Sequence, residues 1–119
     1  MLQEFPVTHR TTEPLRRWFA DEYFDLVVWT SETGAIVAFE LCYDKPRFER
    51  ALTWSQERGW GHFRVDSGED TPIKNHTPIL VSDGLFPKSQ VIAHLSEAST
   101  CIDPTVRAFV LTKLEESQP

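Results

Sequence analysis

The chain has 119 residues, of which 40% are hydrophobic and 25% charged, and its formal net charge is −6. This length and composition are those of one globular domain that needs neither a metal ion nor disulfides to fold. Its basic residues are scattered, which argues against nucleic-acid binding, and no run approaches the roughly 20 apolar residues of a membrane span.

The first segment, residues 1–14, is polar and contains Pro6 and Pro14. It predicts an extended N-terminal arm and lacks the apolar stretch of a secretory signal. The two cysteines, Cys42 and Cys101, are too few for a disulfide framework. We therefore expect reduced thiols and a cytoplasmic protein.

The middle of the chain alternates short turns with runs of β-branched and aromatic residues, a pattern typical of an antiparallel meander. We expect these strands at residues 23–30, 35–43, 48–55 and 60–66. Residues 15–20 (LRRWFA) fit either a strand or a helical turn, and their aromatics favour the strand. A polar loop at 67–78 precedes an apolar run at 79–84 that can form a fifth strand.

The C-terminal part changes to a helical period. Apolar residues recur at helical spacing in residues 87–98 and again in 104–116, and Asp103 followed by Pro104 is a helix N-terminal signal. Strands followed by helices predict an α+β fold. We expect a single domain over residues 1–119, with a four- to five-stranded meander sheet in residues 15–81 and a helical cover on one face from residues 82–119.

Alternation along each expected strand divides the sheet into two faces. Phe39, Leu52 and Phe63 fall on the apolar face, which we expect the helices to cover. The other face is expected to be exposed and to carry a set of polar residues. These residues are Glu40, Cys42, Glu49, Thr53, His62, Arg64 and Asp66.

The polar set has two interpretations. It is either a solvated sheet face with cross-strand acid–base pairs, or a site in which Glu40 and Glu49 face each other near Arg64 and shift a carboxyl pKa. Cys42 would need a nearby histidine to act as a nucleophile, and His62 is two strands away, at about 10 Å. The sequence therefore favours Cys42 as a small apolar filler.

A second cluster runs from His62 to His76. His62, Asp66 and His76 are residue types that bind zinc or iron, and Glu69 could serve as general base. No recognised metal-binding spacing such as HExxH is present, and acids in a polar loop are commonly just solvated. No other cofactor is expected.

The motifs RRWFADEYFDLVVW, FELCYDK, ALTW and HFRVDSGED…TPIL resemble a small family of uncharacterised bacterial single-domain proteins. The resemblance extends from Leu15 to Leu114. It implies an α+β domain and no activity. The matching motif residues, to which the family attaches no role, are Asp44, Lys45, His62, Arg64, Asp66 and Glu69.

Two functions remain open at this stage. The first is a non-catalytic binding or interaction module that uses the exposed face (Glu40, Glu49, His62, Arg64 and Asp66) and the 67–78 loop to bind another protein or an identical subunit. The alternative is a small metal-assisted hydrolase with His62, Asp66 and His76 as ligands. Glu69, Glu40 and Cys42 are the candidate catalytic residues of such an enzyme.

Overall fold

The computed structural model describes residues 1–6, 15–47, 49–66, 79–82 and 86–117, with the backbone alone for residues 65–66 and 79–82. Within these residues, seven antiparallel strands form one sheet in their order along the chain. The strands are β1 (Gln3–Phe5), β2 (Leu15–Ala20), β3 (Asp25–Thr30), β4 (Ile36–Tyr43), β5 (Arg50–Ser55), β6 (Gly59–Asp66) and β7 (Ile79–Ser82). The α+β class is confirmed, and the sheet is larger than the expected four or five strands.

One additional strand comes from the N-terminal arm, because β1 pairs with β2 and places Phe5 opposite Trp18. Leu2 anchors this edge: its side chain is fully buried and its amide donates to the carbonyl of Ala98 at 2.8 Å. Residues 15–20 form a strand, as their aromatic content favoured, since β2 pairs along its whole length with β3.

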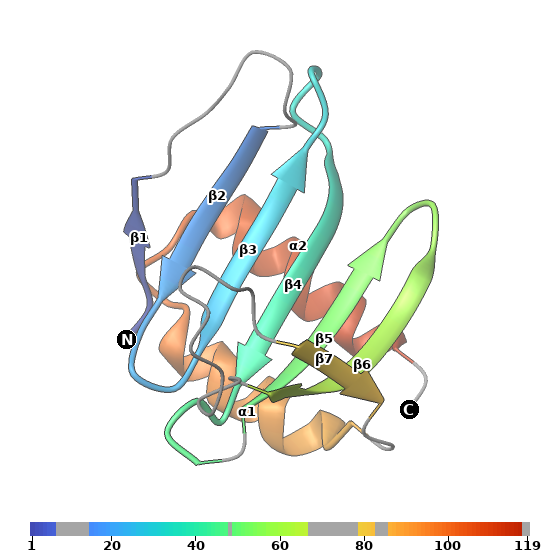
Figure 1. The fold of residues 1–119 in the computed structure, drawn as a ribbon. Coiled ribbons are helices and arrows are strands. Elements are labelled where there is room, and N and C mark those ends of the chain that lie inside the picture. Colours follow the sequence, from blue (N-terminus) through green and yellow to red (C-terminus); the bar gives the residue numbers. More distant parts are fainter. Residues whose placement is uncertain (7–14, 48, 67–78, 83–85, 118–119) are drawn as a thin grey trace.

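Two helices follow the strands, α1 (Lys88–Ala98) and α2 (Pro104–Glu116), close to the expected bounds. Both lie on the same face of the sheet (Figure 1). Asp103 caps α2 as predicted, because its carboxylate accepts a hydrogen bond from the amide of Thr105 at 2.8 Å. The helices contribute their buried apolar stripes to the core, namely Val91, Leu95, Ala98, Val106, Val110 and Leu114.

The core lies between the helices and one face of the sheet. Phe39 and Leu52 belong to it, as expected, and both are almost fully buried. At the margin of the core, the ring centroids of Trp54 and Phe109 of α2 are 5.6 Å apart. The other face of the sheet, which neither described helix covers, is called the open face below (Figure 1).

The β5–β6 hairpin decides which residues of β6 lie on each face. Its turn closes at Gly59, which has a φ of 77°, and the pairing puts Trp54 opposite Trp60. His62 is therefore opposite Leu52 on the helix-facing side, and Phe63 is opposite Ala51 on the open face. The expectation that Phe63 is covered and His62 exposed on the other side was wrong, because the turn at Gly59, and not hydrophobicity, fixes the register of β6.

Candidate binding face

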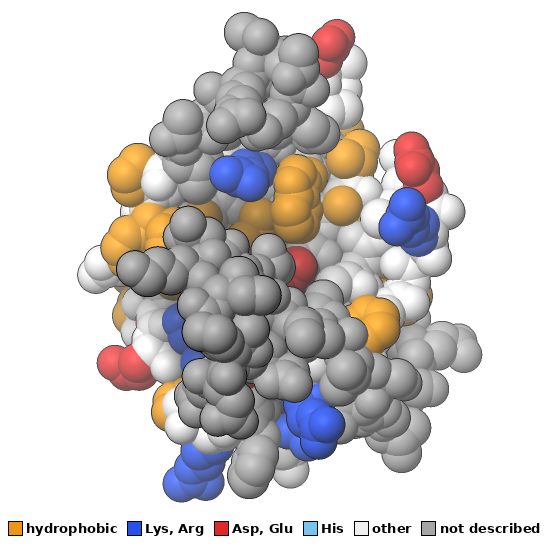
Figure 2. Space-filling model, viewed as in Figure 1, with side chains coloured by type: hydrophobic (Ala, Val, Ile, Leu, Met, Phe, Trp, Pro, Cys, Tyr) orange, Lys and Arg blue, Asp and Glu red, His pale blue; other side chains and the backbone are white. Residues whose placement is uncertain are grey.

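The strand register orders the open face into rows of neighbouring side chains. The central row crosses β2 to β6 and consists of Trp18, Val27, Glu40, Thr53 and Gly61. A second row lies one step along the strands and consists of Arg16, Trp29, Ala38, Ser55 and Gly59. Within these two rows, the aromatic side chains lie on β2 and β3, and the small residues lie on β4 to β6. Figure 2 shows this face, with an apolar patch over β2 to β4 and basic side chains on either side.

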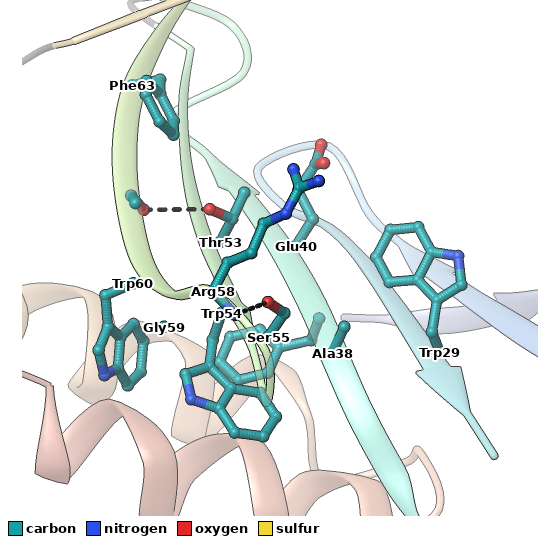
Figure 3. Close-up of a pocket in the computed structure, with 12 residues that line it drawn as sticks. Trp29, Ala38, Glu40, Thr53, Trp54, Ser55, Arg58, Gly59, Trp60 and Phe63 are labelled. Atoms are coloured by element: carbon teal, nitrogen blue, oxygen red, sulfur yellow. Dashed lines mark hydrogen bonds between the residues drawn. The ribbon is translucent and has the colours of Figure 1, made fainter.

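The described residues form two hollows on this face, and the wider one has a volume of about 400 Å³. Small residues of β4, β5 and β6 form its floor, among them Ala38, Thr53 and Gly61. Trp29 and Phe63 stand on opposite sides of that floor (Figure 3). The result is an open trough with aromatic walls, a shape suited to an inserted side chain.

The floor of the hollow has no side chain at Gly61 because the Phe63 ring occupies the space that such a side chain would need. A Cβ built at Gly61 would lie 2.6 Å from the Phe63 ring and 2.8 Å from the Thr53 hydroxyl oxygen. The Phe63 ring therefore packs over the glycine, as aromatic side chains do over glycines in sheets. A larger residue at position 61 would have to displace both neighbours.

The second hollow adjoins the first and has a volume of about 330 Å³. Trp29 and Glu40 line both hollows, so they mark the boundary between them. The remaining walls of the second hollow are Arg16, Trp18 and Val27. Two contacts hold Trp18: its indole N–H donates to Asp25 at 3.1 Å, and its ring lies 4.9 Å from that of Phe5.

Three acids surround Cys42 on the open face. The Cys42 thiol donates to Glu40 at 3.4 Å, and Lys45 pairs with Asp25 at 3.3 Å. Burial raises the pKa of Cys42 far above its ordinary value, and the charges of Glu40, Glu49 and Asp25 raise it further. Burial and the Asp25 charge also raise the pKa of Glu49. A thiol whose pKa is raised in this way is protonated at neutral pH and is a poor nucleophile.

The expected grouping of Glu40, Glu49 and Arg64 does not form. The structure brings Glu40, Cys42 and Glu49 together. Arg64 of β6 lies opposite Arg50 of β5 in the strand register, on the helix-facing side of the sheet. Arg64 is exposed there, with the sheet between it and the two glutamates. Lys45, not Arg64, lowers the pKa of Glu49, although the raising effects are larger.

His62 also lies away from the open face. Its Nε2 is 2.6 Å from the Tyr43 hydroxyl, and its ring lies 5.6 Å from that of Phe86, which is buried in the core. Asp66 ends β6, but its side chain, like Glu69 and His76, lies outside the described residues. The described residues contain no group of three or more His, Cys, Asp or Glu that could hold a metal ion.

Among the residues that shape the two hollows, sequence reasoning missed Trp18 and Phe63 and left the face of Trp29 undecided. Trp18 was ambiguous because residues 15–20 fit either a strand or a helical turn, and Trp29 because β3 is apolar on both faces. The signal that could have placed Phe63 was the short loop at residues 56–58, since a three-residue loop followed by a glycine fixes the register of the following strand.

Comparison of the chain with family models, with curated proteins and with solved structures finds no match. The resemblance to a family of bacterial proteins therefore remains a prediction. Neither helix of the described part of the chain is long and apolar enough to cross a membrane.

Proposed function

We propose that this protein is a non-catalytic binding module that holds another protein on the open face of its sheet. The observation that carries the proposal is the pair of adjoining hollows on either side of Trp29, which together give this face both depth and aromatic surface. Buried aromatic contacts surrounded by polar side chains are typical of the centres of protein interfaces. The 67–78 loop, the other half of the expected binding surface, lies outside the described residues.

The reactive side chains of the described residues give no support to the enzymatic alternative. Cys42 has a raised pKa, and His62 is hydrogen-bonded to Tyr43 on the other side of the sheet. The metal-assisted hydrolase would need His62, Asp66 and His76 to converge. Because no observation favours that convergence, the alternative stays a prediction from sequence.

Site-specific photo-crosslinking tests the proposal. A benzophenone amino acid replaces Ser55, which lines the wider hollow, and in a control chain replaces Glu97 on the exposed side of α1. Irradiation of cells producing each chain should give a discrete adduct with one other protein from position 55 only. Mass spectrometry identifies that protein, which is then purified for binding measurements.

The purified partner must bind through the hollow. Ala38→Arg fills the floor and should weaken binding at least about tenfold, which corresponds to roughly 1.4 kcal/mol. Identical adducts from positions 55 and 97, or an affinity unaffected by Ala38→Arg, would reject the open face as the binding surface. An adduct between two copies of this chain would keep the face and change the occupant.

A further inference from the structure

We propose that the wider hollow receives an aromatic side chain carrying a hydrogen-bond donor, a tyrosine or a tryptophan, from the bound partner. This inference rests on the proposed function of the open face and names the chemistry of its anchor. The floor consists of small residues, and Trp29 and Phe63 stand at its sides (Figure 3). A flat ring can lie on such a floor and contact the Trp29 ring, an arrangement that aromatic pairs favour.

The hollow also contains a polar group that can accept a hydrogen bond from the donor at the edge of such a ring. Glu40 is half-buried where the two hollows meet, and a carboxylate only accepts hydrogen bonds. A phenol O–H or an indole N–H would donate to it. A phenylalanine ring would cover the carboxylate without a donor, which is unfavourable because the lost hydration is not replaced.

Arg58 supplies the other polar contact. Its backbone amide donates to the Ser55 hydroxyl at 2.9 Å, which fixes the base of the side chain in the β5–β6 turn. From there the side chain extends over the hollow toward the end at which Glu40 lies (Figure 3). A guanidinium in this position can cover the face of an inserted ring and gain a cation–π contact.

The two opposite charges of the hollow give a charged occupant little net attraction. An inserted lysine or arginine would be attracted by Glu40 and repelled by Arg58, and the reverse holds for an inserted carboxylate. An aliphatic side chain would use neither charged group and would lack the ring contact with Trp29. A neutral aromatic ring with a donor is the side chain that uses all three residues.

Nuclear magnetic resonance titration of the full ¹⁵N-labelled chain tests this directly. The probes are N-acetyl-tyrosinamide, N-acetyl-tryptophanamide, N-acetyl-phenylalaninamide and N-acetyl-leucinamide. The tyrosine and tryptophan amides should cause saturable shifts of the Ala38, Thr53 and Gly61 amide signals, with a Kd on the order of 1 mM. The phenylalanine amide should bind about tenfold more weakly, and the leucine amide should not saturate.

Two variants separate the contributions. Glu40→Leu should abolish the preference for tyrosine over phenylalanine, whereas Arg58→Ala should weaken all three aromatic amides about equally. Shifts located elsewhere, equal binding of all four probes, or an unchanged tyrosine preference in Glu40→Leu would overturn the inference. A crosslinked partner together with any of these outcomes leaves the proposed function standing, while loss of the crosslink removes the function itself.

Discussion

Trp54 lies directly opposite Trp60 across the β5–β6 hairpin, and both pack beside Phe39 on the helix-facing side of the sheet. This pairing decides that Phe63, and not His62, belongs to the open face. A shift of one residue would exchange the two faces of β6, because successive side chains of a strand point in opposite directions.

The positive φ of Gly59, 77°, is the backbone feature that closes this hairpin. Gly59→Ala should lower the free energy of unfolding by about 1 kcal/mol, because a Cβ disfavours the left-handed conformation even though no atom lies within 4 Å of it. Gly59→Asn is the matched control and should lose less, since asparagine tolerates this conformation. Urea denaturation measures both, and equal losses would contradict the account.

Gly61 should be sensitive for a different reason. Gly61→Ala places its Cβ against the Phe63 ring and should cost about 2 kcal/mol of unfolding free energy through overpacking. In a Phe63→Ala background the same substitution should cost less than half as much, because the ring is gone. A double-mutant cycle by urea denaturation measures this coupling, and additive losses would show that the ring does not pack over Gly61.

The two cysteines should differ in reactivity. Cys42 is buried beside acids that raise the pKa of its thiol, whereas Cys101 is exposed. With iodoacetamide at pH 8, Cys101 should react at least about 100-fold faster than Cys42 in the folded chain. Mass spectrometry of the single variants Cys42→Ser and Cys101→Ser follows each thiol, and denaturation should equalise them. Rapid labelling of Cys42 in the folded chain would contradict its placement.

The N-terminal strand should add a pH-dependent contribution. Hydrogen bonds from Arg17 to both oxygens of Glu4, each 2.8 Å, lower the pKa of Glu4 below its ordinary 4.5. Because the contact with Arg17 lowers the pKa of Glu4 in the folded state, it stabilises the fold above pH 4.5. This stabilisation is lost as the pH falls through 4.5 and then through the lower pKa of the folded state. Because both side chains are partly exposed, Glu4→Gln should cost only about 0.5 kcal/mol at pH 7 and nothing near pH 2.

Thermal denaturation across this pH range measures the effect. Glu32→Gln, in the exposed β3–β4 turn, controls for the removal of one negative charge. A Glu4→Gln difference that persists unchanged to pH 2 would exclude the ion pair with Arg17 as its source.

Local patterns predicted most of the fold, because the helices and the β3–β4 hairpin are encoded by nearby residues. The Asp103 cap, the apolar stripes of the helices and Gly34 with its φ of 89° all matched the expected elements. The strand β1 was missed because three residues with exposed side chains carry no clear strand signal. What fixes β1 is its pairing with β2, together with the burial of the neighbouring Leu2, and both are long-range effects.

The candidate site was predictable only in part. Glu40 and Cys42 share one face of β4, as alternation along the strand predicts, and Glu49, directly before β5, lies close enough to raise the pKa of Cys42. His62 and Arg64 were misplaced because β6 is polar on its helix-facing side, where the Tyr43 hydroxyl lies 2.6 Å from Nε2 of His62. At this margin of the core, the polar His62 faces the helices and the apolar Phe63 faces the open side, the opposite of what hydrophobicity alone predicts.

Two aromatic residues on opposite sides of the sheet provide the most direct test of the central claim. Trp29 borders both hollows, whereas Phe109 of α2 lines neither and lies on the helix-covered side, with its ring centroid 5.6 Å from that of Trp54. The measurement is the affinity of the crosslinked partner for Trp29→Ala and Phe109→Ala, each confirmed as folded by circular dichroism. Trp29→Ala should weaken binding at least about tenfold and Phe109→Ala no more than about twofold. An equal loss, or a greater loss in Phe109→Ala, would contradict binding at the open face.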